Sequence, residues 1–418
     1  MRLIVEALHS YHTTRRLSRA GLPRTSLMAA QAKALRHWLD HDLPQVAAFA
    51  GPPARLSDLP VMDKALLMAS FADYNHPNIT AEQVTGALAA DCKVAGYTVG
   101  ASTGTSGNRG YFVISDLERY RWLGALLAKA MAGLLWQAQR IAIILPQDTR
   151  LYSSARSVPH LQLRFFASTE GVDAWRDAIE NYNPTVIVAA PKVLRYFVEG
   201  GLRLTPRRVF SAAETLDPVD RRVIEAGFNL TLGQIYMATE GLLGVTCAHG
   251  HLHLAEDSIA FEYEPVGDGL VSPLITSFRR QVQIMARYRM NDLLRLSDQP
   301  CPCGSPLQRV DEVVGRMDDC FDIRGVLVTP DVLRNAVLQA DTRIVDFRVI
   351  QQPDGAIALL LPPELDSSVA ETARTSVAHA LTRLGVAPQV SVTRQPLPVD
   401  FSRKLRRVEC RLPKDTRP

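Results

Sequence analysis

The sequence predicts an α/β protein with a large N-terminal domain, residues 1–316, followed by a small mobile α+β domain, residues 317–418. Its length of 418 residues exceeds what one ordinary core accommodates. Between residues 140 and 228, strand-like apolar runs alternate with helical patterns, which favours a mostly parallel sheet with flanking helices. After Thr239 the apolar runs shorten, which indicates a β-rich subdomain ahead of the small domain.

The elements of the large domain follow in order from their local patterns. Apolar residues at helical spacing predict a helix over 25–43, and Asp63 would cap a second helix reaching Tyr74. The capping box at 115–118 opens a long helix that is expected to end at about Trp136. Strands are then expected at 140–146, 161–168, 185–191 and 207–214, with helices at 172–182, 191–200 and 217–227.

The C-terminal part of the sequence has the pattern of a compact unit. Short β segments are expected over about 251–289, and the domain boundary is placed near Met317-Asp318-Asp319. Beyond it, Pro353-Asp354-Gly355 signals a hairpin turn, residues 366–385 a helix, and QVSVTR (389–394) a strand.

Composition and charge narrow the class of protein. The chain is 47% hydrophobic and 22% charged, as a folded globular protein is, and its net charge of +4 argues against a dedicated nucleic-acid binder. The longest apolar run, 123–136, is interrupted by Lys129 and is too short to span a membrane. The N-terminal apolar stretch carries Glu6 and His9, unlike a signal peptide. We therefore expect a cytoplasmic enzyme with no nucleic-acid or membrane partner, and a homodimer is compatible with these features.

The stretch GASTGTSGNRGYFVIS, residues 100–115, concentrates glycine and hydroxyl side chains. Glycines let backbone N–H groups converge and hydroxyls add donors, so such a loop can cradle phosphate oxygens. The Walker pattern is absent, because Gly-Lys-Ser/Thr is missing. Taken alone, the stretch could equally be a solvated hairpin loop.

Three later motifs carry groups that suit a nucleotide. Tyr236-Met-Ala-Thr239-Glu240 ends a predicted strand with a ring, a hydroxyl and a carboxylate, which suit a purine, a phosphate and Mg²⁺. YRMND (288–292) and GRMDD (315–319) supply a carboxylate and an arginine that suit ribose and phosphate oxygens. SRKLRR (402–407) supplies a lysine that suits a developing oxygen charge. Taken singly, they could be a capped strand, a surface ion pair and a solvated basic tail.

In this order, the hydroxyl/glycine loop, Tyr-x-x-Thr-Glu, Tyr-Arg-x-x-Asp, Gly-Arg-x-Asp-Asp and the late lysine resemble the adenylate-forming ligase superfamily. More closely, the chain resembles the phenylacetate–CoA ligase branch and the related deazaflavin-coenzyme adenylating synthetases. The resemblance runs from about Leu59 to Val408, most of the chain. Each motif is weak by itself, and their common order is specific.

The resemblance implies an ATP site. Residues 102–107 would hold the β- and γ-phosphates, Ala213-Glu214 and Tyr236 would enclose the adenine, and Asp292 with Arg316 would hold the ribose. The full set expected to contact ATP is Ser102, Thr103, Gly104, Thr105, Ser106, Gly107, Ala213, Glu214, Tyr236, Met237, Thr239, Asp292 and Arg316.

The catalytic residues that the resemblance implies are Lys404, Glu240 and Thr239. Lys404 would stabilise the adenylation transition state, Glu240 would bind Mg²⁺, and Thr239 would contact the α-phosphate. Asp318 would be the hinge about which the small domain swings.

The chain departs from the family pattern at four positions. Arg109 stands where a lysine is usual after the loop, and Met237, Asn291 and Arg403 stand where glycine is usual. Arginine keeps the charge but not the geometry of lysine. Glycine often marks a positive φ, so the last three positions bear on the loop conformations.

The cysteine spacing indicates a metal. The chain has six cysteines, and Cys301-Pro-Cys303-Gly304 forms a tight knuckle. With Cys247 and His253, three thiolates and one imidazole would make a closed structural Zn²⁺ site. The pattern resembles that of proteins in the phenylacetate–CoA ligase branch. His249 and His251 are rival ligands, and inert buried cysteines are the plain alternative.

The expected reaction is ATP-dependent adenylation of a carboxylic acid, followed by transfer of the acyl group to a thiol. The thiol would belong to CoA or to the pantetheine of an acyl carrier protein. Transfer of AMP to a cofactor hydroxyl, and a non-enzymatic nucleotide-binding protein, are the alternatives. The family leans to aryl acids, such as a hydroxybenzoate or phenylacetate, and the aromatic residues that could line the acid pocket are Tyr152, Phe165, Phe166 and Tyr196.

Overall fold

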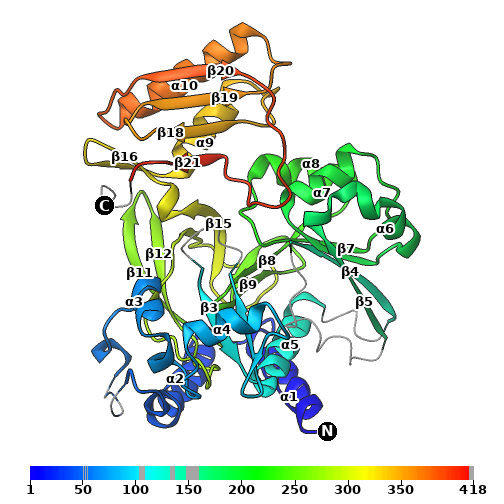
Figure 1. The fold of residues 1–418 in the computed structure, drawn as a ribbon, viewed down its shortest axis with the longest axis vertical. Helices are drawn as coiled ribbons and strands as arrows, with labels where there is room; N and C mark the ends of the chain where they lie inside the picture. Colours follow the sequence, from blue (N-terminus) through cyan, green and yellow to red (C-terminus); the bar gives the residue numbers. More distant parts are fainter. Residues whose placement is uncertain are drawn as a thin grey trace.

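The fold is that of a computed structural model, which describes residues 1–49, 51, 53, 55–102, 109–131, 137–146 and 160–413. Within these residues, one 12-stranded sheet forms the centre of the large domain, and a separate four-stranded sheet forms the small domain above it (Figure 1). The α/β class predicted from the sequence is confirmed.

One half of the large sheet is parallel, in the order β5-β4-β6-β7-β8. Apolar side chains of α6, α7 and α8 cover one face of it, and those of α5 cover the other. The strands and helices expected between residues 140 and 228 are confirmed to within a few residues. Their bounds are β4 Gln139–Leu145, β5 Leu161–Ala167, α6 Arg176–Tyr182, β6 Val186–Ala189, α7 Pro191–Glu199, β7 Arg208–Ala212, α8 Pro218–Phe228 and β8 Gly233–Ala238.

The β-rich region continues the same sheet in antiparallel pairing instead of forming a layer of its own. The tight turn at Thr239-Glu240 returns the chain from β8 into β9, and the order then runs β9-β10-β15-β14-β12-β11. The parallel arrangement therefore holds only up to β8. The bounds are β9 Gly241–Thr246, β10 Leu252–Leu254, β11 Ala260–Gly267, β12 Leu270–Thr276, β13 Tyr288–Arg289, β14 Asp292–Leu296 and β15 Arg309–Arg316.

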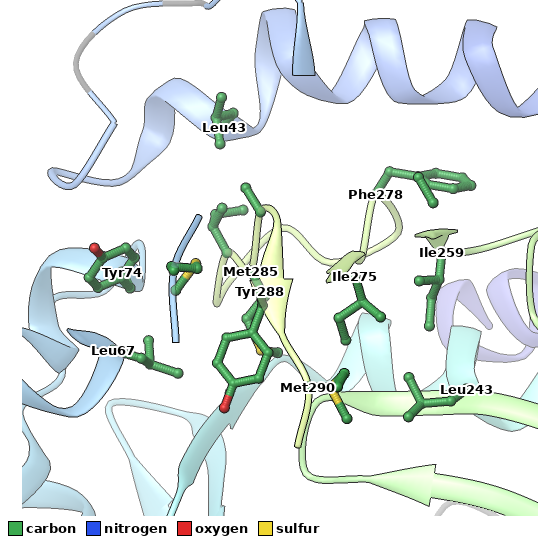
Figure 2. Close-up of a cluster of buried hydrophobic side chains, with 14 of the residues drawn as sticks. Leu43, Leu67, Tyr74, Leu243, Ile259, Ile275, Phe278, Met285, Tyr288 and Met290 are labelled. Carbon is green, nitrogen blue, oxygen red and sulfur yellow. The ribbon is translucent and has the colours of Figure 1, made fainter. Parts of the chain in front are cut away.

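The N-terminal segments cover this antiparallel half and its connections. Figure 2 shows part of the resulting apolar cluster, in which Leu67 and Tyr74 lie to one side of Tyr288 and Leu43 lies above it. The cluster joins the N-terminal helices to β13 and β14, which carry the YRMND motif. The elements are α1 Arg2–Leu17, α2 Arg24–His41, α3 Lys64–Ala69, η3 Phe71–Tyr74, α4 Ala81–Leu88, β1 Lys93–Val94, β2 Tyr97–Ala101, β3 Tyr111–Ile114 and α5 Asp116–Ala130.

The predicted helix starts are confirmed, and two helix ends differ. The Asp63 carboxylate accepts the backbone N–H of Leu66 at 2.8 Å, but α3 stops at Ala69, and a 3₁₀ turn completes the stretch to Tyr74. Ser115 and Glu118 form the capping box of α5. That helix ends at Ala130, while residues 132–136 lie outside the described part.

The small domain has a hydrophobic core of its own, formed between its sheet, in the order β20-β19-β18-β21, and helices α9 and α10. The hairpin turn at Gly355 and the helix near 366–385 are present as predicted, whereas α9 was not predicted. The bounds are η7 Met317–Asp319, β16 Phe321–Ile323, β17 Val326–Val328, α9 Pro330–Ala340, β18 Arg348–Gln351, β19 Ile357–Leu361, α10 Ser367–Arg383, β20 Val390–Arg394 and β21 Val408–Cys410. The division between residues 316 and 317 stays a prediction.

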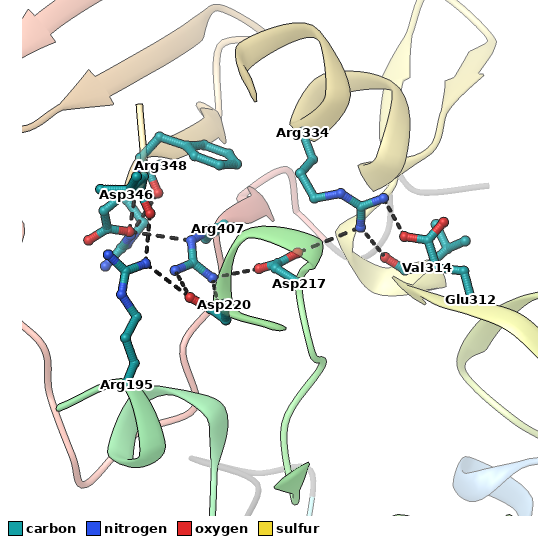
Figure 3. Close-up of polar contacts among 11 residues, drawn as sticks. Arg195, Asp217, Asp220, Glu312, Val314, Arg334, Asp346, Arg348 and Arg407 are labelled. Atoms are coloured by element: carbon teal, nitrogen blue, oxygen red, sulfur yellow. Dashed lines mark hydrogen bonds and ion pairs between the residues drawn. The ribbon is translucent and has the colours of Figure 1, made fainter. Parts of the chain in front are cut away.

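Charged side chains join the two domains in what we call the Arg407 cluster (Figure 3). The buried Arg407 guanidinium lies 2.6 Å from a carboxylate oxygen of Asp217 and 2.6 Å from one of Asp220, at the start of α8. It also lies 3.3 Å from Asp346 of its own domain. Arg195 of α7 lies 3.0 Å from Asp220 as well. The contact between the domains therefore contains several buried charges.

Among the described helices, none combines the length and the apolar character that a membrane span requires.

Candidate active site

The nucleotide motifs converge beside the carboxyl end of β8. The buried Tyr236 of β8 donates its hydroxyl to the Asp292 carboxylate at 2.7 Å, although their strands are not neighbours in the sheet. Asp292 begins β14 and lies opposite Arg316, which ends β15. Thr239 and Glu240 form the turn directly after β8. The Tyr236–Glu240 motif and the YRMND and GRMDD motifs thus lie together beside the carboxyl end of a strand, where α/β sheets bind their ligands.

The carboxylates of Asp292 and Glu240 are partly shielded from solvent. Burial raises the pKa of the Asp292 carboxyl group, against the hydrogen bond from Tyr236 and the charges of Arg316 and Lys404. Burial also raises the pKa of the Glu240 carboxyl group, which accepts a hydrogen bond from the Tyr288 hydroxyl. A bound cation would restore favourable solvation for both carboxylates.

Lys404 of the small domain lies near these carboxylates. It lies on the connection from β20 to β21, and the charges of Glu214, Asp292 and Glu240 all act on its ammonium group. Burial of this ammonium group and the nearby Arg316 lower the pKa of Lys404, although the residue as a whole is exposed. Lys404 therefore lies near Glu240, Asp292 and Arg316 of the preceding motifs, although they are far apart in sequence.

The phosphate loop is described only at its two ends. Ser102 donates its backbone N–H to the carbonyl of Gly110 at 2.8 Å, and its hydroxyl accepts the N–H of Gly110 at 2.9 Å. Thr103, Gly104, Thr105, Ser106 and Gly107 lie outside the described residues.

Lys64 is a candidate site residue that the motifs did not reveal. A Cβ added at Gly110 would lie 3.3 Å from the Lys64 Cε and 3.8 Å from its Nζ, so this side chain packs closely against the end of the loop. The Lys64 charge also acts on Glu240. The only sequence signal was a lysine directly after the helix-capping Asp63, which we interpreted as the start of a helix.

The departures from glycine do not disturb the backbone. Met237, Asn291 and Arg403 all have negative φ, so none of the three positions needs glycine. Asn291 instead contacts the expected hinge: its amide donates to the Asp318 carboxylate at 2.6 Å and its oxygen accepts the Asp318 N–H at 3.2 Å. Ala213, which was expected beside the adenine, does have a positive φ, of 69°.

Of the aromatic residues expected near the acid, the three in the described part of the chain lie in different surroundings. Phe166 lies in the core against Trp175, with ring centroids 5.2 Å apart, so its position gives no support to a pocket role. Tyr196 donates its hydroxyl to Asp173 at 2.6 Å, and its ring meets Phe401 edge-on. Phe165 packs against the cluster beneath α5, and Tyr152 lies outside the described residues.

The four predicted zinc ligands lie together. The ligand atoms of Cys247, His253, Cys301 and Cys303 are all within 4.8 Å of one another. The Cys247 and Cys301 sulfurs are 3.7 Å apart, and the Cys303 sulfur is 3.4 Å from His253 Nε2. Tetrahedral zinc with Zn–S bonds of about 2.3 Å has edges of about 3.8 Å between sulfurs and about 3.6 Å from sulfur to nitrogen. The residues therefore fit a closed zinc site.

A second contact supports the choice of histidine. The Nδ1 of His253 lies 3.0 Å from the Leu307 carbonyl, which leaves Nε2 facing the thiols. Metal-binding histidines usually donate their other ring N–H in this way. The rival His251 has its Nδ1 3.3 Å from the Cys301 sulfur, but it is not part of the mutually close set.

Two curated proteins match parts of this chain. Phenylacetate-coenzyme A ligase of Thermus thermophilus is 23% identical over 199 residues, 43% of this chain and 44% of that protein. Protein CapK of Staphylococcus aureus is 23% identical over 165 residues, 38% of this chain and 37% of its own length. The match thus spans less than half of the length of these relatives. No family model matches the sequence.

Solved structures match nearly the whole chain. 2-Hydroxyisobutyryl-CoA ligase in the postadenylation state, with 2-HIB-AMP, gives a TM-score of 0.69 at 20% identity, over 96% of this chain and 92% of that one. The same ligase in its thioesterification state, with 2-HIB-AMP and CoA, gives a TM-score of 0.55 at 19% identity, over 94% and 91%. The chain therefore has the fold of the adenylate-forming ligases. The resemblance to phenylacetate–CoA ligase, inferred from the order of the motifs, is confirmed by the match to that protein.

Proposed function

We propose that this protein is an ATP-dependent acid–thiol ligase, which adenylates a carboxylic acid and passes the acyl group to CoA. The observation that carries the proposal is the position of Lys404, close enough to Glu214, Asp292 and Glu240 of the large domain for their charges to act on its ammonium group. An ammonium group so placed suits the negative charge that grows on phosphate oxygens during adenylation. The better match to the postadenylation state of the related ligase, 0.69 against 0.55, supports the same step.

In the first step, a carboxylate oxygen of the substrate attacks the α-phosphorus of ATP. The bond from that phosphorus to the bridging oxygen breaks, and pyrophosphate leaves. Lys404 and Thr239 would contact the α-phosphate, Tyr236 and the backbone at Ala213 the adenine, and Asp292 with Arg316 the ribose. Thr239 and the half-buried Glu240 carboxylate have the oxygen ligands that Mg²⁺ prefers, and the ion would neutralise phosphate charge when bound.

In the second step, the CoA thiolate attacks the acyl carbon. A thioester bond forms, AMP leaves, and the thiol proton passes to solvent. No enzyme nucleophile is required. Asp318, held by Asn291, would be the hinge that lets the small domain leave the ATP site between the steps.

For the substrate we propose an aryl carboxylic acid of the phenylacetate or hydroxybenzoate type. The proposal rests on the relative from Thermus thermophilus, because the aromatic residues considered above give it no support. The short hydroxy acid of the structural neighbour is the rival class.

The test of the function is an assay for pyrophosphate release and thioester formation over a panel of aryl, short hydroxy, fatty and amino acids. Release of pyrophosphate and AMP with aryl acids and free CoA is expected. Product only with holo acyl carrier protein would change the acceptor, and AMP retained on the product would replace the ligase by nucleotidyl transfer. Turnover with hydroxy acids but not aryl acids would contradict the substrate class.

Lys64 is proposed as a further contact of the ATP phosphates. We expect Lys64→Met to raise the KM for ATP by about tenfold or more, because a hydrogen bond to a charged group contributes about 1.5–3 kcal/mol. The KM for the acid should change little. Lys93→Met removes an exposed lysine from β1 and serves as the control. An unchanged KM for ATP in Lys64→Met would exclude this contact.

A further inference from the structure

A buried lysine of the large domain contacts the loop that carries Lys404. Lys192 lies in the first turn of α7, and its side chain is 3% exposed. Its ammonium group lies 2.7 Å from the Glu214 carboxylate and donates to the backbone carbonyls of Asp400, at 3.1 Å, and of Arg403. An ammonium group has three N–H donors, and three acceptors surround this one. Its contacts are thus divided between the two domains.

Glu214 contacts the same loop on the other side of Lys404. Its carboxylate, 7% exposed, pairs with the Lys192 ammonium and lies near the backbone N–H of Leu405. The residue before Lys404 is therefore held through its carbonyl, and the N–H of the residue after it lies beside the Glu214 carboxylate. Because these contacts occupy the Glu214 side chain, the backbone at Ala213-Glu214 would make the adenine contact expected there.

The rest of the loop also rests on the large domain. The Phe401 ring meets Tyr196 of α7 edge-on at 5.5 Å, and the Phe401 carbonyl accepts the Ser168 hydroxyl at 3.2 Å. Figure 1 shows this red segment passing close to α7 and α8 before it enters β21. Residues 395–407 form no helix or strand, so side-chain contacts set their position.

From these contacts we infer that the Lys192–Glu214 pair positions Lys404 for adenylation, without touching the reacting atoms. The inference rests on the proposed function. Lys192 and Glu214 belong to the large domain, and the loop belongs to the small one, so the contacts exist only while the domains are packed as they are here. The pair would therefore serve adenylation and not the thioester step.

The test compares the two half-reactions in Lys192→Met and Glu214→Gln. The rate of adenylation, measured by pyrophosphate exchange, should fall by about a hundredfold, because a misplacement of about 1 Å can cost that much. The KM for ATP should stay within about twofold of its normal value, as expected when only the position of Lys404 is disturbed. Thioester formation from supplied acyl-adenylate should be retained. The double variant should lose little more than either single one, since the two residues act as one unit.

A measurement without substrates separates this inference from the proposed function. Hydrogen exchange at the Leu405 amide should quicken in both variants, while the strands of the large sheet stay protected and so report an intact fold. Lys33→Met, which removes an exposed lysine from α2, should change neither exchange nor rate. Unchanged exchange at Leu405, or equal loss of both half-reactions in folded protein, would overturn the inference. A wild-type protein that activates no acid would instead refute the proposed function.

Discussion

Replacing Lys404 with alanine is expected to lower the rate of adenylate formation by about 10²- to 10³-fold, the effect of removing one preorganised donor to a developing oxyanion. Lys404 is the cation that the small domain brings to Glu214, Asp292 and Glu240. Without it, the α-phosphate charge would develop beside acidic groups and face one positive charge fewer. Thioester formation from supplied acyl-adenylate should be largely retained, because that step follows departure of the loop.

Two measurements check this role. The half-reactions are followed separately, with Arg383→Ala, which removes an exposed charge of α10, as the matched control. Burial and Arg316 lower the pKa of Lys404, so its charged form is lost at a lower pH than that of an ordinary lysine. Adenylation by the wild type should therefore decline as pH rises through this lowered pKa. Equal loss of both half-reactions in Lys404→Ala would contradict the assignment.

Replacing Cys301 with serine is expected to have the largest effect on stability. The protein should carry about one zinc per chain, and the variant should lose it, since serine is a poor zinc ligand. The four ligands join the end of β9, strand β10 and the loop between β14 and β15. A structural zinc contributes its binding free energy to folding, so we expect thermal unfolding of the large domain about 10 °C or more below the wild type.

The control for the zinc site is Cys92→Ser, which changes a cysteine outside the four-residue set. It should keep both the metal and the unfolding temperature. Elemental analysis of protein purified without chelator gives the metal content directly. Protein that contains no zinc under those conditions would show that the cysteines are merely packed together.

Local signals predicted much of the large domain. The Asp63 cap, the capping box at Ser115 and the alternation from residue 140 to Phe228 all depend on near neighbours in sequence, and the structure has them. Helix α1 was missed because apolar residues occur on its exposed face, at Ile4, Val5 and Leu8, as well as on its packed one. This blurs the amphipathic pattern on which helix prediction depends.

The residues of the candidate site were likewise predicted only in part. The order of the motifs predicted that Tyr236, Asp292 and Lys404 act together, and the structure brings them into one place. No motif marks Lys64 or Lys192, because the proposed role of each depends on contacts with residues that are distant in sequence. Phe166 lies in the core, and its local sequence could not distinguish a core from a pocket lining, because an apolar ring in a strand suits both.

The Arg407 cluster bears on how easily the two domains can part. If they were joined by apolar surface alone, separation would expose that surface to water at a cost proportional to its area. Here separation would also let water reach Arg407, Asp217 and Asp220, and the hydration of these ions would offset much of the attraction they lose. The packed and parted arrangements could then have similar free energies, as an enzyme that alternates between two half-reactions requires. Dissolved salt, which screens ion pairs once water enters, would favour the parted arrangement.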